Sequence, residues 1–471
     1  MTKNVLLIAY HWPPSNAAGT HRSLRFARHL RQFDWEPVVL TAARPIYQRY
    51  DPNLLNRVPL CITVMEAPHR DPWLYFLNWR EQRLSLVDRQ QARLTPLSVF
   101  LGNEGLLYRI LKEVVSWLEC RLYHPDIYMG WIKSAVAVAL NNYRGSDFQA
   151  IYATGGPWSD FEVGYQLSRH WGIPLVLDFR DPWTIAYYSS GERRPQWAKA
   201  RDRRRLACYL AAAQAVIFLH GTCAECYLSA FPRSLDDRKI HLIPNGFEAA
   251  DMYTSPPARG ECLSITYAGT LYSRKFDTLL SALSSLARQY NHQLKIKISF
   301  IGESQEMAIK IVKQLGLTSY IKFFPSMPFE ETNGVMKDSH ALLLLGEEPS
   351  AGYEIYATSK IFHYLSLGRP ILGIMPPNEG KRLLQSLRAG LRVDVESITE
   401  IESALLTLYR AWENGSLSHF LPTPESLQPY IEPNLTAALV LALSGLPAQH
   451  PYRKGEAEVP PSLQHYFKRL K

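Results

Sequence analysis

Short apolar runs alternate with helix-like segments along most of the chain. In the first half the runs are nearly continuous and rich in Leu, Ile and Val, which is typical of parallel strands that are covered on both faces. After the first run, Leu24, Ala27, Leu30 and Phe33 fall on one side of a predicted helix at 20–33. The strands predicted in this half lie at 4–10, 36–41, 149–154, 174–179, 214–219 and 239–243.

The same alternation starts again after the polar, Pro-rich stretch "AADMYTSPPARGE". The pattern therefore predicts two doubly wound α/β domains joined by a linker, at 1–245 and 246–414. A helical insertion interrupts the first domain at about 70–135, and a Pro-rich tail at 415–471 carries helices that we expect to pack back on that domain. The remaining predicted strands are 263–268, 295–301, 320–324, 340–345 and 370–374, and the predicted tail helices are 433–444 and 461–470.

A length of 471 residues fits two domains, and the charge is unevenly divided between them. Residues 1–245 hold 30 Lys and Arg against 21 Asp and Glu, whereas residues 246–471 hold 22 of each. All of the net charge of +9 therefore lies in the first half. Such asymmetry favours an acidic partner for that half, which could be nucleic acid, an anionic membrane surface or a phosphorylated substrate.

Several protein classes are disfavoured by the same sequence. Six cysteines in so long a chain form no disulfide framework, and the single C-x-x-C at Cys223 and Cys226 is best interpreted as a pair of buried or idle thiols. No stretch reaches the roughly 18 apolar residues of a membrane span. The N-terminus enters a strand without a signal-peptide layout, so we expect a cytoplasmic protein and not a periplasmic binding protein of similar two-domain design.

The first predicted strand runs into "AYHWPPSNAAGTHRSLRFARHL", where two prolines are followed by small residues up to Gly19. Small residues allow close approach of the backbone, and the next helix offers free N–H groups and a positive dipole end, with Arg22 in its first turn. This arrangement predicts an anion or a sugar over the loop. The loop matches neither the G-x-G-x-x-G nor the G-x-x-x-x-G-K-[ST] pattern, which disfavours a nicotinamide or ATP site.

Polar residues also follow two later strands of the first half. In "LVLDFRDPWT" a buried strand ends in Asp178, Arg180 and Asp181, at the edge where α/β enzymes bind ligands. Polar groups packed this closely are costly unless they are used, although an internal Arg–Asp pair would also satisfy them. In "ATGGPWSDF" the backbone near Gly155 and Gly156 either holds an acceptor or makes a tight turn.

The second half carries two candidate anion sites. In "ITYAGTLYSRK" a strand and Gly269 precede Arg274 and Lys275, which could neutralise a diphosphate or could be a solvated basic pair. In "YEIYATSKIFHYLSLGRPIL" hydroxyls, helix N–H groups and an ammonium converge at the start of a predicted helix. The residues concerned are Thr358, Ser359 and Lys360.

Taken in order, these stretches resemble a known family. Together with "HPDIYMGWIKSA" and "IPNGFE", they are similar to the family 4 retaining glycosyltransferases of the cell-surface polysaccharide type, over most of residues 4–375. The resemblance implies the GT-B fold, two Rossmann-like domains facing across a cleft. It implies an acceptor-binding first domain, a second domain that binds a nucleotide-sugar donor, and transfer to a glycan or lipid-linked glycan with no metal ion and no cofactor.

The resemblance also assigns roles to the candidate residues. It makes Arg180, Asp181 and Asp178 the catalytic residues, with Arg180 and Asp181 facing the transferred sugar, and it places Arg22, Gly155 and Gly156 on the acceptor side. The donor site would be built from Gly19, Gly269, Arg274, Lys275, Glu354, Thr358, Ser359, Lys360 and His363.

His363 is a departure from the family pattern, which has a ribose-binding glutamate at this position. A second family glutamate, eight positions earlier, falls on Ile355, with Glu354 beside it. A histidine can hydrogen-bond a ribose hydroxyl, and Glu354 could serve after a shift of one residue. The departure keeps two alternatives open, a non-catalytic nucleotide-sugar-binding protein and a nucleotide-sugar epimerase of the same fold.

The basic first half suits a lipid-linked acceptor at an anionic membrane, where each nearby Lys or Arg contributes about 1 kcal/mol. The segments 71–80 and 192–205 are the expected contacts, the first rich in Trp and the second in Arg; the alternative is a core helix and a solvated helix. We therefore expect a cytoplasmic protein that is peripheral on the inner face of the membrane. No known nucleic-acid-binding motif is present, and no nucleic-acid partner is expected.

Overall fold

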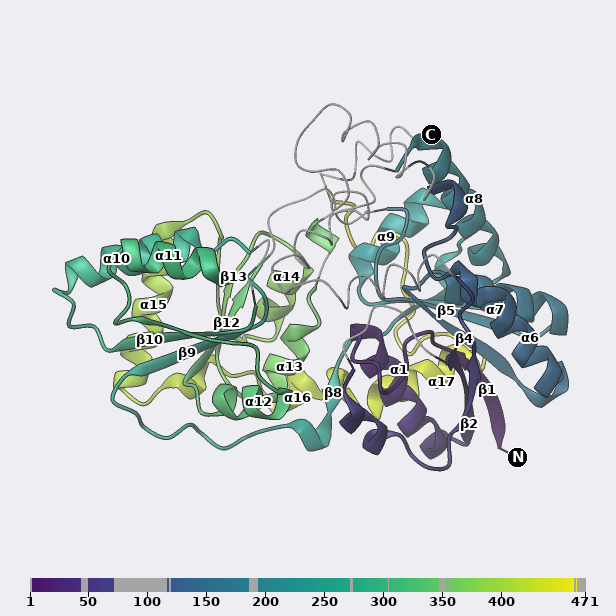
Figure 1. Ribbon diagram of the computed structural model, residues 1–471, viewed down its shortest axis with the longest axis horizontal. Coiled ribbons are helices and arrows are strands. Elements are labelled where there is room, and N and C mark those ends of the chain that lie inside the picture. The colour runs from purple at the N-terminus through teal and green to yellow at the C-terminus, as the bar shows by residue number, and fades with distance from the viewer. Residues whose placement is uncertain are drawn as a thin grey trace. The chain divides into compact units, whose positions relative to one another are not determined.

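The computed structural model divides the chain into two compact units (Figure 1), Met1–Pro244 with Leu435–Lys471, and Asn245–Asn434. Most of the predicted insertion, the segment 72–80 and most of the predicted helix at 461–470 lie outside the residues that the structure describes. The described residues are 2–43, 50–71, 117, 120–185, 194–271, 274–303, 305–346, 353–355, 357–460 and 463.

The first unit is built on a seven-stranded parallel sheet with the order β3-β2-β1-β4-β5-β6-β7. The strand order reverses between β1 and β4, and such a switch point opens a crevice at the carboxyl ends of the strands. The bounds are β1 Lys3–Ile8, β2 Trp35–Ala42, β3 Thr63–Ala67, β4 Ala150–Gly155, β5 Leu175–Phe179, β6 Ala215–Phe218 and β7 Ile240–Leu242.

Helices cover both faces of this sheet because successive strand residues point to opposite sides. Val5 and Leu7 share an apolar cluster with Leu24 of α1 and Leu439 of α17. On the other face α7 lies so close that a β-carbon on its Gly164 would be 3.0 Å from a side-chain atom of Leu175. The helices are α1 Ala18–His29, α6 Ile132–Asn142, α7 Ser159–Trp171, α8 Gln196–Ala212, α9 Gly221–Ala230 and α17 Asn434–Leu443.

The second unit contains a six-stranded parallel sheet with the order β11-β10-β9-β12-β13-β14, and it switches between β9 and β12. The strands are β9 Leu263–Ala268, β10 Ile296–Ile301, β11 Ile321–Phe324, β12 Ala341–Leu345, β13 Ile371–Ile374 and β14 Gly390–Val393. The helices are α10 Asp277–Gln289, α11 Glu306–Gln314, α12 Phe329–Lys337, α13 Lys360–Ser366, α14 Glu379–Ser386, α15 Ile398–Glu413 and α16 Pro424–Leu427.

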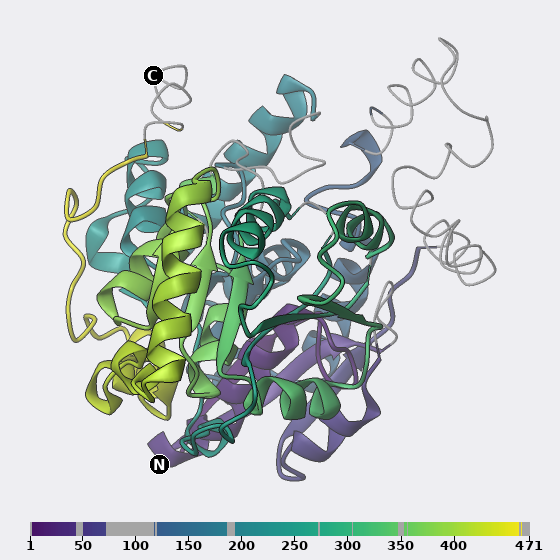
Figure 2. The same cartoon turned by 90° about the vertical axis from the view of Figure 1, so that its left-hand side faces the viewer.

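Strand β12 shows how this sheet is buried on both faces. Leu343 and Leu345 pack in one cluster with α10, α11 and α15, while Leu342 and Leu344 pack in another with α12, α13 and α14. Figure 1 shows α10 and α11 on one side of the sheet and α12 and α13 on the other, and Figure 2 shows the yellow-green α15 beside the green strands. The continuous run "ALLLL" is therefore the sequence of a central strand.

The tail divides differently from the predicted boundary at 414. Residues 415–434 stay with the second unit, because Leu427 and Ile431 are buried in its core and β15 (Ile431–Glu432) pairs with β8 (Phe247–Glu248). Helix α17, at the position of the predicted helix 433–444, packs on the first unit. Among the described residues, none of the helices is long and apolar enough to cross a bilayer.

Candidate functional site

The switch point of the first unit brings together residues from three strand ends. Tyr10 and His11 follow β1, Gly156 follows β4, and Arg180 and Asp181 follow β5. Since the strands are parallel, these residues lie at the same edge of the sheet. Gly156, Arg180 and Asp181 were expected here from the sequence, whereas Tyr10 and His11 were not.

Arg180 is held in place by the backbone of this edge. Its Nε donates to Thr154 Oγ1 at 2.9 Å, and its Nη2 donates to the carbonyl of Gly156. The guanidinium also lies against Gly19, where a β-carbon would fall 2.5 Å from Cζ and 2.6 Å from Nη2. The structure thus brings Gly19, Gly156 and Arg180 together, and glycine at position 19 leaves room for the cation.

Electrostatics at this edge perturb two ionisable groups. Burial, and then the positive charge of Arg180, lowers the pKa of His11 to about 3, so its imidazole is neutral at physiological pH. Asp181 keeps an exposed side chain, yet desolvation by the surrounding protein raises its pKa, and Arg180 opposes that shift. His11 was not among the predicted site residues; its position directly after the first strand was the available signal.

Two further aspartates, also absent from the prediction, lie at the start of α7. Asp126 accepts hydrogen bonds from the backbone amide of Ser159 at 3.1 Å and from its hydroxyl at 2.6 Å, and also from the backbone amide of Trp158. Asp160 accepts from the amide of Tyr10 at 3.0 Å, and burial raises its pKa well above the usual value. The amides that open α7 are therefore occupied by Asp126, which favours the tight-turn interpretation of "ATGGPWSDF" over acceptor binding by those amides.

Arg22 and Asp178 form a buried ion pair below this edge. Arg22 Nε and Nη2 donate to the two carboxylate oxygens of Asp178 at 2.8 and 3.0 Å, and Thr154 and Tyr152 donate to the same carboxylate. Arg22 is 2% exposed and Asp178 is 0% exposed. Arg22 also donates to the carbonyls of Ile243 and Pro244. This geometry favours an internal ion pair over contact with a substrate for both residues. Asp178 is paired with Arg22 of α1 and not, as the sequence alternative had it, with an arginine of its own loop.

At the switch point of the second unit, Lys360 reaches the end of β9. Its Nζ donates to the carbonyl of Ala268 at 3.0 Å and lies 5.0 Å from the ring centroid of Tyr267. Gly269 has φ +141°, and a β-carbon there would overlap Lys360 Nζ. Glycine is required at position 269 both for this backbone conformation and for the approach of the lysine.

Arg274 reaches the neighbouring strand end. Its Nη1 donates to the carbonyl of Leu345, the last residue of β12, at 3.2 Å. Since β9 and β12 are the two strands of the switch point, Lys360 and Arg274 bring two cations to one edge. Lys275, by contrast, is engaged in an ion pair with Glu396.

The other predicted donor-site residues lie around the start of α13 or just before it. The amides of Ile361 and Phe362 donate to the carbonyls of Thr358 and Ser359, both at 3.2 Å, so the helix begins where the sequence predicts. The His363 ring lies 5.3 Å from the ring of Phe329. Glu354 belongs to a 3-10 turn (Tyr353–Ile355), and its backbone carbonyl accepts a hydrogen bond from Arg382.

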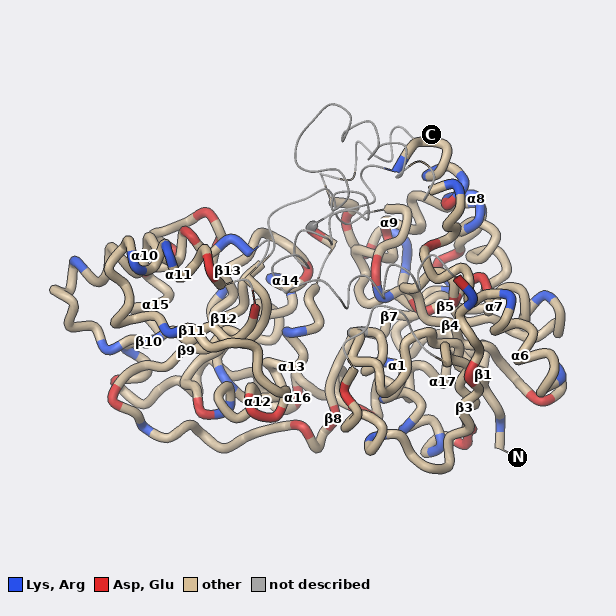
Figure 3. The backbone as a smooth tube through the Cα atoms, viewed as in Figure 1, with Lys and Arg blue, Asp and Glu red and all other residues tan. Residues whose placement is uncertain are grey.

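Helix α8 carries most of the basic segment proposed for membrane contact (Figure 3). Arg205 forms an ion pair with Glu162, Arg194 pairs with Asp202, and Arg203 donates to the carbonyl of Ala230. Arg201 donates to the carbonyl of Cys120. Arg204 is exposed, and within the described ranges its side chain has no hydrogen bond or ion pair. Most of this charge therefore serves contacts within the protein.

Comparison with known proteins gives the fold. No family model and no curated protein matches the sequence. Sucrose-phosphate synthase from Thermosynechococcus elongatus superposes with a TM-score of 0.58 and 11% identity, over 93% of this chain and 97% of the other. The lipopolysaccharide outer core galactosyltransferase WaaB, in its apo form, gives 0.54 and 11%, over 94% of this chain and 99% of the other.

A putative UDP-N-acetylglucosamine 2-epimerase from Listeria monocytogenes is also similar, with a TM-score of 0.52 and 9% identity over 94% of this chain and 96% of the other. At such identities the likeness establishes a shared fold. The chain has the GT-B fold with two Rossmann-like domains, which confirms the predicted fold class.

Proposed function

We propose that the protein is a glycosyltransferase that moves a sugar from a nucleotide-sugar donor to a glycan or lipid-linked glycan. The observation that carries the proposal is the pair of cations, Lys360 and Arg274, at the switch point of the second sheet. Ligands of doubly wound sheets bind at the carboxyl ends of the strands at this point. The GT-B likeness, which includes a galactosyltransferase, supports the same class of reaction.

The second unit is the proposed donor site. A nucleoside diphosphate gains negative charge as its bond to the sugar breaks, and preorganised cations lower the barrier by stabilising that charge. Lys360 and Arg274 are preorganised because each is fixed by a backbone carbonyl of a strand end. Thr358, Ser359 and Gly269 would adjoin the diphosphate, and His363 or Glu354 would contact the ribose. Lys275 is assigned a lesser role because Glu396 pairs with it.

The first unit is the proposed acceptor site. Arg180 and Asp181 form a fixed cation and an exposed carboxyl at its switch point. The neutral imidazole of His11 adds a group that can exchange hydrogen bonds with sugar hydroxyls. We assign retention of configuration, with the attacking hydroxyl on the face of the leaving diphosphate, whose oxygen assists removal of the proton. In this mechanism the charge of the diphosphate is balanced by Lys360 and Arg274, with no metal ion.

The test is a panel of UDP-, GDP- and dTDP-linked sugars incubated with the purified full chain, with released nucleoside diphosphate measured by mass spectrometry. Slow release from one donor, lost in Lys360→Met and Arg274→Met, would support the proposal. Lys297→Met is the matched control, because Lys297 is an exposed residue of β10 whose side chain has no hydrogen bond or ion pair among the described residues. Lys275→Met is expected to fall between these variants.

The same panel separates the alternatives. A non-catalytic binding protein would bind one donor in calorimetry and release no diphosphate in the presence of any acceptor. An epimerase would convert the sugar of the donor, which NMR of the recovered nucleotide sugar detects. Absence of binding to every donor would contradict the assignment of Lys360 and Arg274 to a donor site.

The class of acceptor and the location of the protein in the cell are also part of this proposal. We propose that the acceptor belongs to polysaccharide or glycolipid synthesis and that the protein works at the cytoplasmic face of an anionic membrane. The net charge of +9, all of it within residues 1–245, supports this location. The segment 72–80 lies outside the described residues, and in 194–205 the exposed Arg204 is the strongest remaining contact.

A further inference from the structure

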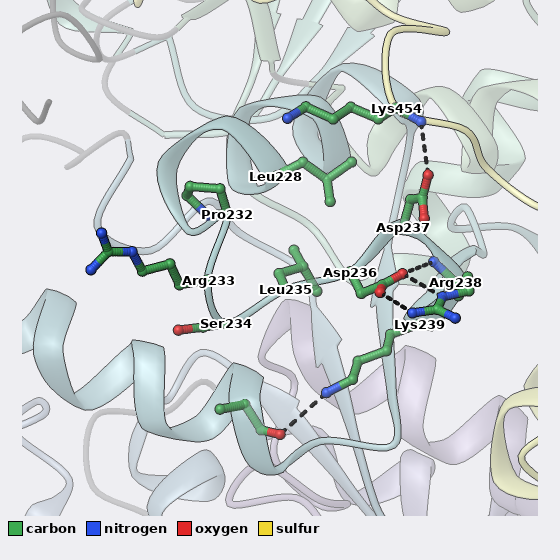
Figure 4. Close-up of a pocket in the computed structure, with 11 residues that line it drawn as sticks. Leu228, Pro232, Arg233, Ser234, Leu235, Asp236, Asp237, Arg238, Lys239 and Lys454 are labelled. Atoms are coloured by element: carbon green, nitrogen blue, oxygen red, sulfur yellow. Dashed lines mark hydrogen bonds and ion pairs between the residues drawn. The ribbon is translucent and has the colours of Figure 1, made fainter.

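A pocket of about 510 Å³ lies in the first unit (Figure 4). It is formed by the end of α8, the end of α9 and the loop 232–239 that leads into β7, with Lys454 from the C-terminal segment. These segments precede β6 and β7, so the pocket lies at the amino-terminal edge of the parallel sheet. Arg180 and Asp181 lie at the carboxyl edge.

The pocket has more positive than negative side chains. Four cations line it, Arg233, Arg238, Lys239 and Lys454, with the two carboxylates of Asp236 and Asp237. The volume lies within the range of about 300–1,000 Å³ that small-molecule sites occupy. Its apolar lining residues are Leu228, Pro232 and Leu235, with Ala211 at the end of α8.

Two of the cations are engaged by the protein. Arg238 donates to both oxygens of Asp236, at 3.0 and 2.6 Å, and Figure 4 shows its guanidinium turned toward that carboxylate. Lys239 Nζ donates to the carbonyls of Leu210 and Ala211 at the end of α8, at 3.3 and 3.2 Å. Desolvation lowers the pKa of Lys239, and the charge of Asp236 opposes that shift.

Arg233 and Lys454 differ from Arg238 and Lys239 in the contacts of their side chains. In the part of the chain that the structure describes, neither side chain has a hydrogen bond or an ion pair, and both are exposed. Lys454 is nevertheless well positioned, because its segment is fastened to the first unit. Its own amide donates to Asp237 at 3.3 Å, and the adjacent Gly455 amide donates to the buried Glu225 at 2.8 Å. Tyr452 donates to the same carboxylate at 2.9 Å.

The C-terminal segment therefore brings a cation from more than 200 positions away in the sequence to the rim of a pocket that is also lined by Arg233, whose side chain has no ion pair among the described residues. Two uncompensated positive charges over a partly apolar concave surface match a ligand that has about two negative charges and an organic part. A bilayer surface is nearly flat and fits a concave pocket of this size less well.

We propose that this pocket binds a soluble small molecule that carries phosphate groups, with Arg233 and Lys454 contacting the phosphates and Leu228, Pro232 and Leu235 contacting the organic part. The site is separate from the proposed donor and acceptor sites. Its ligand would bind to the first unit whether or not the second unit holds a nucleotide sugar.

Site-resolved lysine acetylation of the full chain tests this proposal, with inorganic pyrophosphate as the probe. The acetylation rate of each lysine is followed by peptide mass spectrometry as pyrophosphate is added. Lys454 is expected to become about sixfold slower when pyrophosphate reaches about five times its dissociation constant. Lys297, exposed in the second unit, reports any change in the reagent. The acetylation rate of Lys360 reports on the proposed donor site, so the proposed pocket ligand and the proposed donor site are tested by separate measurements.

The matched variants are Arg233→Glu and Arg204→Glu, which make the same charge change at two exposed positions of the first unit. Protection of Lys454 is expected to be lost in Arg233→Glu and kept in Arg204→Glu, with unchanged circular dichroism for both. Lys454 rates that do not respond to pyrophosphate would overturn the proposal, as would protection that persists in Arg233→Glu. Protection by phosphatidic acid vesicles without protection by pyrophosphate would overturn it in favour of a membrane contact.

Discussion

Gly19 lies directly against the guanidinium of Arg180, and a β-carbon at position 19 would fall 2.5 Å from Arg180 Cζ. The two residues are 161 positions apart, and they meet because α1 starts and β5 ends at the same edge of the first sheet. The small-residue loop that follows β1 thus makes room for a side chain of the protein itself. We expected this space to serve the donor diphosphate.

Gly19→Ala should separate activity from stability. The new methyl group must displace Arg180, and small displacements of positioning groups cost up to about 100-fold in rate, so we expect at least about a tenfold loss of sugar transfer. Position 19 is the second residue of α1 and has no positive φ, so the helix propensity of alanine, worth up to about 1 kcal/mol, offsets the loss of the Arg180 hydrogen bonds, and we expect little net change in stability. Steady-state kinetics and thermal unfolding measure the two effects.

Gly334→Ala in α12 is the control for this prediction. A β-carbon at Gly334 would meet no atom within 4 Å, so this variant gains the helix propensity without a collision. We expect equal or higher stability and unchanged transfer. A Gly19→Ala protein with full activity would show that the position of Arg180 is irrelevant to the reaction.

For the buried Arg22–Asp178 pair we predict a loss of stability, whereas Gly19→Ala is expected to change activity. Asp178→Asn leaves the Arg22 charge without its counter-ion, and breaking such a pair costs about 3–5 kcal/mol of unfolding free energy. Urea unfolding should therefore show a large loss of stability in the first unit. Arg180→Met is the comparison, since Arg180 is only partly buried and its loss should reduce transfer with little change in the unfolding midpoint. An Asp178→Asn protein of normal stability that cannot transfer sugar would restore the catalytic interpretation of Asp178.

The fold followed from the sequence wherever strands are buried on both faces. The run at 263–268 coincides with β9, and "ALLLL" is β12. Besides the two-residue strands β8 and β15, two strands of the large sheets, β3 and β14, were not predicted. Both lie at an edge of their sheet, and most of their residues are partly or fully exposed, so neither presents a continuous apolar run.

The candidate sites were predictable only in part. Strand ends identify the edge at which residues such as Arg180 and Lys360 gather, because parallel strands all end on the same side. Sequence cannot show which polar groups pair with each other. Asp178 and Asp181 are three positions apart, yet one is fully buried against Arg22 and the other is exposed. That difference depends on Arg22 of α1, which lies 156 positions before Asp178.

Part of the acid sensitivity of the first unit should depend on His241, in addition to the contribution of His11, whose pKa is also lowered. This residue of β7 is 3% exposed, and burial lowers its pKa to about 4. The folded state therefore binds fewer protons than the unfolded state between about pH 4 and 6.5, so stability falls as pH is lowered through this window. A shift from 6.5 to about 4 amounts to about 3 kcal/mol at pH 4.

His241→Phe removes the titration while keeping an aromatic ring in the strand. The free energy of unfolding, measured in urea at intervals from pH 7 to pH 4, should fall less steeply in this variant than in the wild type. His170→Phe is the matched control, because His170 is exposed on α7. A pH profile of His241→Phe that is parallel to the wild type would show that other groups cause the acid sensitivity.

Membrane contact by α8 must be tested at Arg204 and not at its neighbour. Arg205 pairs with Glu162 and also lies over the ring of Tyr209, so reversing its charge would place two carboxylates together and destabilise the first unit. Arg204 is exposed, so Arg204→Gln should leave the unfolding free energy unchanged.

If α8 contacts an anionic bilayer, loss of one charge weakens vesicle binding by about 1 kcal/mol, or about fivefold, at low salt. Sedimentation with phosphatidylglycerol vesicles measures this, and Lys297→Gln in the second unit is the charge-matched control. Equal binding by both variants would contradict a membrane contact through Arg204.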